Sequence, residues 1–175
     1  MAGYRGRVEV LRIGHRPGRD PRLTTHLALT ARALGAAAFH LHPPDPDVAR
    51  QIEDVNRRFG GAFHIEGVRE WRSFMKSWPG TSVHLTMYGE DLDDILPRAK
   101  LTPPVLLVTG GAKVPSELYQ LAGYNVAVTH QPHSEVAALA LTLDRLLGVP
   151  RGPAPEGAQI EILPSPRGKR VVEHR

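Results

Sequence analysis

Hydrophobic and polar residues follow two different periodicities along the chain. Alternating or continuous apolar runs predict strands, and apolar residues spaced three or four positions apart predict helices. The predicted strands are residues 8–13, 36–41, 62–65, 82–87, 105–108 and 124–128, and the predicted helices are residues 24–34, 48–59, 70–78, 90–99, 115–123 and 134–147. Because strands and helices take turns, the pattern predicts an α/β fold, a mainly parallel sheet flanked by helices on both sides.

The pattern changes after the last predicted helix. Residues 149–157 are rich in proline and glycine, which predicts a linker. Residues 158–163 and 169–173 are short strand-like runs on either side of a turn-forming segment, and together they predict a β-hairpin. We therefore expect a main domain over residues 1–148, and over residues 149–175 a linker and hairpin that extend the same domain.

The composition narrows the class of protein. The 175 residues include no cysteine, which excludes disulfides and thiolate-bound metals. No apolar run approaches the roughly 20 residues that a transmembrane helix needs, and no apolar signal core follows the basic N-terminus. We expect a soluble cytoplasmic protein that does not act on membranes.

Basic residues are concentrated at the two ends of the chain. Lysine and arginine (22) exceed aspartate and glutamate (18), which gives a net charge of +4. Six arginines fall within residues 1–22, and the C-terminal segment carries Arg167, Lys169, Arg170 and Arg175. Arginine clustered in this way favours a phosphate-rich partner over an evenly solvated surface.

Three loops that follow predicted strands carry unusual residues, namely residues 85–89, 109–114 and 128–135. The carboxyl ends of parallel strands share one edge of a sheet, and ligands bind there. Gly110-Gly111 matches neither a dinucleotide fingerprint nor a P-loop, and the alternative to a binding loop is a tight turn. Ser134 and Glu135 fit either a ligand-binding turn or the cap of a helix.

A polar loop over residues 14–22 follows the first predicted strand and holds a histidine and several arginines. It fits phosphate capture near a reactive centre, or a solvated turn with an internal Arg–Asp pair. The nine histidines raise the question of a metal, but His130 and His133 lie across a proline turn and no HExxH motif occurs. We expect no metal, and no Ser-His-Asp arrangement is visible.

Several long blocks of the sequence point to one family. The blocks are Leu11–Ala36, Val83–Gly89, Gly111–Pro115, Tyr124–Leu139 and Arg167–Glu173. In this order they resemble the archaeal tRNA (cytidine-56) 2′-O-methyltransferases, from about residue 8 to residue 173. The resemblance implies a SPOUT-class domain with a deep C-terminal trefoil knot, and a homodimer whose active site draws on both subunits. It also implies methylation of the ribose of cytidine 56 in the tRNA T-loop, with S-adenosylmethionine as methyl donor.

The resemblance implies particular site residues as well. S-adenosylmethionine is expected against Leu85, Gly110, Gly111, Ala112, Lys113, Val114, Val128, Thr129, His130, Gln131, Pro132, His133, Ser134 and Glu135. RNA is expected against His15, Arg16, Arg19, Arg22, Arg167, Lys169 and Arg170. Arg22, and after it Arg16, are the candidate catalytic arginines, acting by phosphate positioning and electrostatic stabilisation because a guanidinium stays protonated. His15 and His26 are the candidate proton acceptors.

Two other functions stay open on the sequence alone. A non-catalytic RNA-binding module would explain the basic ends, and a failure to bind S-adenosylmethionine would favour it. A nucleotide-dependent oxidoreductase would fit an α/β domain, but the chain has no dinucleotide fingerprint, and this function would require NAD binding.

Overall fold

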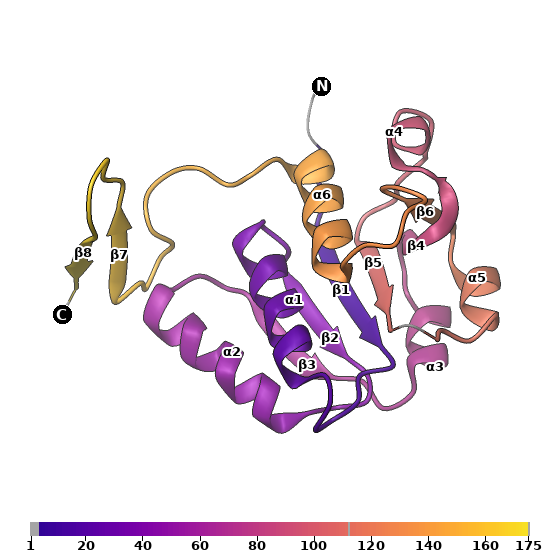
Figure 1. The fold of residues 1–175 in the computed structure, drawn as a ribbon, viewed down its shortest axis with the longest axis horizontal. Helices are drawn as coiled ribbons and strands as arrows, with labels where there is room; N and C mark the ends of the chain where they lie inside the picture. The colour runs from indigo at the N-terminus through magenta and orange to yellow at the C-terminus, as the bar shows by residue number, and fades with distance from the viewer. Residues whose placement is uncertain (1–3, 112, 175) are drawn as a thin grey trace.

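The central feature of the fold is a six-stranded parallel sheet with the strand order β3-β2-β1-β5-β4-β6 (Figure 1). The structure is a computed structural model, and it describes residues 4–111 and 113–174. The strands are β1 (Val8–Ile13), β2 (Ala38–Leu41), β3 (His64–Gly67), β4 (Ser82–Asp91), β5 (Val105–Gly110) and β6 (Tyr124–Ala127). The expected mainly parallel sheet is therefore confirmed.

Helices cover both faces of this sheet. The helices are α1 (Pro21–Ala33), α2 (Pro46–Phe59), α3 (Trp71–Lys76), α4 (Leu92–Ile95), α5 (Glu117–Leu121) and α6 (Glu135–Leu147). The larger core joins α1, α2, α4 and α6 to alternate residues of the strands, such as Val8 and Val10. The smaller core joins α3 and α5 to the opposite face, through Leu11 and Ile13. Every residue of β1 is buried, because both faces of this central strand are covered.

Helices α1 and α4 differ from their predicted bounds for reasons that the structure shows. Helix α1 begins at Pro21, three residues before the expected start, because Pro21 occupies its first turn, where the missing N–H costs nothing. Helix α4 is limited to residues 92–95, since Glu90 and Asp91 instead pair with Val126 and Ala127 and lengthen β4. The acidic segment 90–99 was therefore wrongly predicted as one helix.

Strand β4 is irregular where it passes β6. Its pairing shifts register between Leu85 and Glu90, so residues 86–89 leave the regular ladder. Gly89 lies against the β6 backbone, and a Cβ there would come within 2.4 Å of the Val126 nitrogen. A glycine allows this close approach. Thr86, Met87 and Tyr88 of the displaced segment line a pocket at the edge of the sheet.

The C-terminal segment forms a separate two-stranded antiparallel sheet of β7 (Ile160–Leu163) and β8 (Arg170–Glu173), as the sequence predicts. The linker before it follows an extended path past α2, and the Gln159 amide donates a hydrogen bond to the Arg58 carbonyl at 3.0 Å. Figure 1 shows the hairpin at the opposite end of the molecule from α5. The trefoil knot stays a prediction.

Candidate functional site

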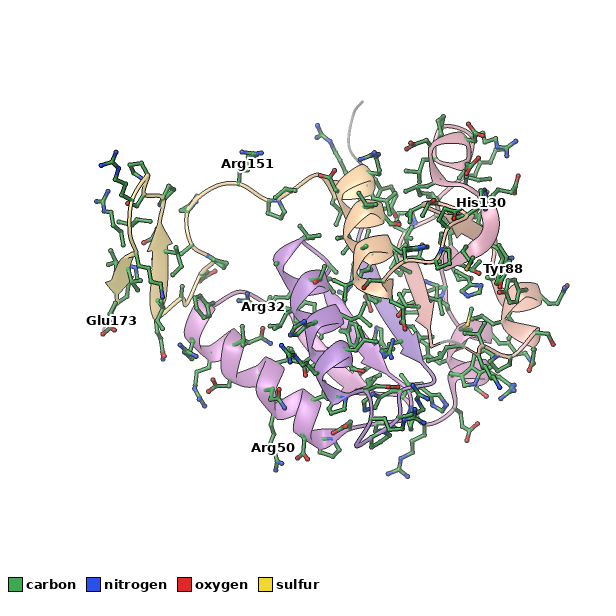
Figure 2. The ribbon with its side chains drawn as sticks, viewed as in Figure 1. Arg32, Arg50, Tyr88, His130, Arg151 and Glu173 are labelled. Carbon is green, nitrogen blue, oxygen red and sulfur yellow. The ribbon has the colours of Figure 1, made fainter. Side chains whose placement is uncertain are left out.

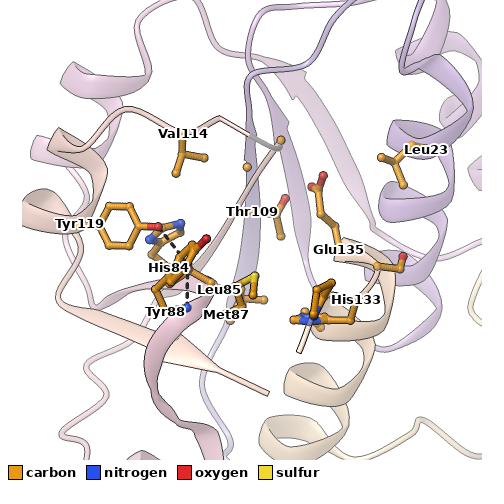
Figure 3. Close-up of a pocket in the computed structure, with 16 residues that line it drawn as sticks. Leu23, His84, Leu85, Met87, Tyr88, Thr109, Val114, Tyr119, His133 and Glu135 are labelled. Carbon is orange, nitrogen blue, oxygen red and sulfur yellow. Dashed lines mark hydrogen bonds between the residues drawn. The ribbon is translucent and has the colours of Figure 1, made fainter. Parts of the chain in front are cut away.

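A pocket of about 430 Å³ opens at the carboxyl ends of β4 and β5 and is closed on one side by the start of α6 (Figure 3). From the expected cofactor-binding set, the residues that line it are Leu85, Gly110, Gly111, Val114, Pro132, His133, Ser134 and Glu135. All three loops selected from the sequence contribute residues to the lining of this pocket. Their convergence is what a parallel sheet requires, because the ends of adjacent parallel strands lie at one edge.

The other expected cofactor-binding residues lie outside this lining. They are Lys113, Val128, Thr129, His130 and Gln131, whereas Ala112 lies outside the described residues. The His130 ring donates from Nδ1 to the Met87 carbonyl at 2.8 Å, and its Nε2 lies 3.0 Å from an Asp91 carboxylate oxygen. The bond to the Met87 carbonyl, aided by Asp91, raises the pKa of His130. His130 thus fastens the 128–135 turn to β4, at the edge where Tyr88 also lies (Figure 2).

The pocket also holds residues that sequence reasoning missed. They are Leu23, His84, Thr86, Met87, Tyr88, Thr109, Tyr119 and Ala138. Most of them fall within or next to the loops already selected, so closeness to those loops is a usable signal. Tyr119 comes from α5 and enters only through the tertiary fold.

Thr109 carries an unusual buried hydroxyl. Its residue is 2% exposed and lines the pocket, and its Oγ1 makes no hydrogen bond to the described part of the protein. A buried hydroxyl without a partner costs free energy, so such a group in a pocket wall points to a ligand that satisfies it. The pocket therefore has a polar anchor at its base.

His84 and Tyr119 form one side of the pocket. His84 donates from Nδ1 to the Asn125 side-chain oxygen at 2.9 Å, which leaves Nε2 as an acceptor. Its ring lies edge-on to Tyr119 with centroids 4.8 Å apart, and the Tyr119 hydroxyl bonds Thr86 Oγ1 at 3.1 Å. Burial lowers the pKa of His84, which favours the neutral ring.

A completely buried arginine lies behind the pocket wall. Arg12 projects from β1 and donates to Thr24 Oγ1 at 2.9 Å and to the carboxylate of Glu135, with Asp20 3.9 Å away. Glu135 is the first residue of α6 and lines the pocket. Burial raises the pKa of Glu135, although Arg12 partly offsets this effect. The wall of the pocket therefore contains a carboxylate that is held in place by a fixed internal cation.

His15 belongs to the same internal network. It is 2% exposed, and its two ring nitrogens contact Thr24 Oγ1 and an Asp45 carboxylate oxygen, each at 2.8 Å. The hydrogen bond from His15 is the main cause of the lowered pKa of Asp45. Asp45 in turn caps α2 by accepting from the Asp47 and Val48 amides. His15, expected to contact RNA, lies inside the protein and links β1 to α2.

The remaining arginines of the 14–22 loop differ in whether their side chains are already paired within the protein. Arg16 makes two hydrogen bonds to Asp20, both at 2.9 Å, so the internal Arg–Asp pair anticipated as an alternative does form. Arg19 and Arg22 are exposed and make no ion pair within the described residues, and Arg22 adjoins the pocket residue Leu23. The loop touches the glycine loop, since a Cβ on Gly14 would lie 3.9 Å from the Gly111 nitrogen.

Other expected residues lie away from this pocket. His26 is exposed on α1 and does not line it. Arg167, Lys169 and Arg170 are exposed on the hairpin, which lies at the opposite end of the molecule from Tyr88 (Figure 2). Ser134 accepts a hydrogen bond from the Val136 amide, so it caps α6 in addition to lining the pocket. Among residues 4–111 and 113–174, no cluster of three or more metal-ligating side chains occurs, and no helix is long and apolar enough to cross a membrane.

The fold resembles that of solved SpoU-type methyltransferases. The methyltransferase AviRb from Streptomyces viridochromogenes, solved with AdoMet, superposes with a TM-score of 0.60 at 19% identity. The match covers 81% of this chain and 57% of that one, so the chain spans little more than half the length of this solved neighbour. The expected SPOUT-type architecture is thereby confirmed.

Sequence comparison gives the family. Residues 59–172 match the family model described as tRNA ribose 2′-O-methyltransferase, aTrm56. The tRNA (cytidine(56)-2′-O)-methyltransferase of Pyrococcus horikoshii is 51% identical over 95% of this chain and 85% of its own length. That of Natronomonas pharaonis is 49% identical over 94% of this chain and 93% of its own length. The chain therefore belongs to the tRNA ribose 2′-O-methyltransferase family.

Proposed function

We propose that this chain transfers a methyl group from S-adenosylmethionine to the ribose 2′-hydroxyl of cytidine 56 in the T-loop of tRNA. The observation that carries the proposal is the identity of about one half with relatives named for this reaction, over nearly the whole chain. Family membership and the pocket at the sheet edge support it. The internal polar network gives that pocket a rigid wall.

The pocket suits S-adenosylmethionine in size and chemistry. Its volume of about 430 Å³ lies in the usual range for small-molecule sites. The Thr109 hydroxyl, which has no hydrogen-bond partner among the described residues, is available to the ligand. Leu85 and Val114 offer apolar walls, and Gly110 and Gly111 leave the backbone open to close approach. When bound, the group supplies an electrophilic methyl on a cationic sulfur, and no metal is required for its transfer.

The arginine loop is suited to the RNA. In the proposed reaction Arg22, and after it Arg16, hold phosphate and stabilise developing charge near the pocket, while Arg19 adds a further contact. Arg22 is exposed beside a pocket residue, whereas Arg16 is already engaged by Asp20. Arg167, Lys169 and Arg170 lie on the hairpin, at the opposite end of the same chain from this pocket, and contact a different part of the tRNA backbone.

We also infer the organisation of the active protein. Residues 1–148 form the catalytic domain, residues 149–175 a linker and hairpin extension of it, and two chains form a homodimer in the cytoplasm. The hairpin supports dimerisation because an isolated two-stranded sheet is barely stable, and Ile162, Val171 and Val172 on it are exposed. Chromatography coupled to light scattering measures the number of chains directly.

The test of the reaction is methylation of an unmodified tRNA transcript with radiolabelled S-adenosylmethionine, followed by mass-spectrometric mapping. We expect one methyl group on the ribose of cytidine 56, and no labelling when that nucleotide is 2′-deoxy. Labelling retained on the deoxy transcript would indicate base methylation. RNA binding without any heat of S-adenosylmethionine binding would indicate a non-catalytic RNA-binding module.

A further inference from the structure

The proposed methyl transfer releases a proton from the ribose hydroxyl, and the arginines of the 14–22 loop cannot accept it. A ribose hydroxyl is poorly acidic, and transfer of a methyl group to it requires loss of that proton. A guanidinium remains protonated at any working pH and is therefore unsuited to accept it. Of the histidines considered from the sequence, His15 has both ring nitrogens engaged inside the protein, and His26 lies on α1 outside the pocket lining.

Glu135 is placed to serve as the acceptor. Its side chain is 23% exposed and projects from the start of α6 toward the space between Thr109 and Leu23 (Figure 3). Arg12 binds Oε2, and within the described part of the chain no hydrogen bond reaches Oε1. Arg12 and Thr109 are register partners on adjacent strands, which keeps the carboxylate over the pocket floor.

The other titratable groups of the lining are less suited. His84 is 1% exposed and lies behind Tyr119, and the burial that lowers its pKa weakens it as a base. His133 is exposed, and the bond from its Nδ1 to the Gln131 carbonyl at 2.7 Å leaves Nε2 as an acceptor but ties the ring to its own turn and not to the pocket wall. Glu135 combines a free oxygen, a fixed position and access to the pocket.

We propose that Glu135 accepts the proton of the target 2′-hydroxyl. This inference rests on the proposed function. The ribose oxygen forms a bond to the methyl carbon while the carbon–sulfur bond breaks and its electron pair remains on sulfur. The hydroxyl proton moves to Glu135 Oε1 and passes from there to water after product release. Arg12 is a positioning residue: it fixes the carboxylate through Oε2 and leaves Oε1 available.

The experiment compares Glu135→Gln with the wild type and with Glu53→Gln, the same chemical change at an exposed position of α2. Glutamine keeps the size of the side chain and an oxygen for Arg12 but cannot take up the proton. We expect kcat to fall on the order of 100-fold or more in Glu135→Gln, with the calorimetric Kd for S-adenosylmethionine within about twofold of the wild type. Glu53→Gln should match the wild type in both.

Two further measurements test the role of the carboxylate itself. The wild-type kcat/KM should decline toward low pH, and the midpoint of this decline should agree with the ¹³C titration of the Glu135 carboxyl in the free protein. Glu135→Gln should lose that acid limb, and Glu135→Asp should be more active than Glu135→Gln. Circular dichroism establishes that each variant is folded.

Several results would overturn the inference. Wild-type kcat in folded Glu135→Gln would do so, as would an unchanged acid limb. A large loss of S-adenosylmethionine affinity with little further loss of kcat would instead make Glu135 a cofactor contact. Wild-type protein that fails to methylate cytidine 56 refutes the proposed function, which is a separate outcome.

Discussion

Replacement of Arg12 by methionine should strongly destabilise the protein. Arg12 is completely buried, and its guanidinium neutralises a Glu135 carboxylate that is itself only 23% exposed. Removal of one partner of a buried ion pair typically costs about 3–5 kcal/mol, because the other charge is left without compensation. Glu135 retains some access to water, and Thr24 Oγ1 keeps its contact with His15, so we expect the lower end, about 3 kcal/mol.

Urea unfolding measures this loss. The fluorescence of Trp71 and Trp78 reports the transition, and all variants are compared at one protein concentration because association would shift the midpoint. Arg57→Met is the matched control, since Arg57 is 68% exposed and pairs with Asp54 on the surface. The control should change the free energy of unfolding by less than about 1 kcal/mol.

A double variant isolates the uncompensated charge. Arg12→Met combined with Glu135→Gln removes the carboxylate that would otherwise lose its cation, while Asp20 keeps its pair with Arg16, so this protein should be more stable than Arg12→Met alone. If Arg12→Met is as stable as Arg57→Met, or if the second substitution brings no recovery, the assignment of a buried charge pair to this site is refuted.

Three further predictions concern the pocket. Gly111→Val should weaken S-adenosylmethionine binding at least about tenfold in calorimetry while leaving the circular dichroism spectrum unchanged. The reason is that a Cβ there lies at ordinary contact distance, 3.6 Å, from the Gly14 carbonyl, and the branched group enters the pocket. Arg22→Ala should lower kcat on the order of 100-fold with near-normal cofactor affinity, and full activity would exclude its catalytic role. Burial lowers the pKa of His84 below its ordinary 6.5, so as the pH falls the unfolded chain takes up this proton at a higher pH than the folded protein does. The free energy of unfolding should therefore fall as the pH drops below about 6.5, by at most about 1.4 kcal/mol per pH unit, and urea unfolding of His84→Gln should lack this contribution.

Much of the fold could be predicted from the sequence because most elements clearly follow either the strand period or the helix period of apolar residues. Strand β1 matches its predicted bounds, as an apolar run in a covered sheet should. Helix α6 has a serine cap and a terminal glycine, and it differs from its prediction by one residue. The three sheet-edge loops were found for the same reason: strand ends alone determine which loops meet.

The failures come from long-range contacts. Segment 90–99 has a helical pattern, but pairing with β6 holds its first two residues in a strand. Arg12 occupies a strand position where a charge suggests solvent, yet its partner Glu135 lies 123 positions away, and no local pattern links the two. His15 likewise looks like a free loop histidine until Asp45 is brought beside it.

The polar chain from Glu135 through Arg12, Thr24 and His15 to Asp45 joins the first turns of three helices. Glu135 begins α6, Thr24 lies in the first turn of α1, and Asp45 caps α2. Opening any one of these helix starts breaks a link that the others share. In hydrogen exchange, the first turns of α1, α2 and α6 should therefore behave as one cooperative unit, so that the cofactor wall and the arginine loop open together or not at all.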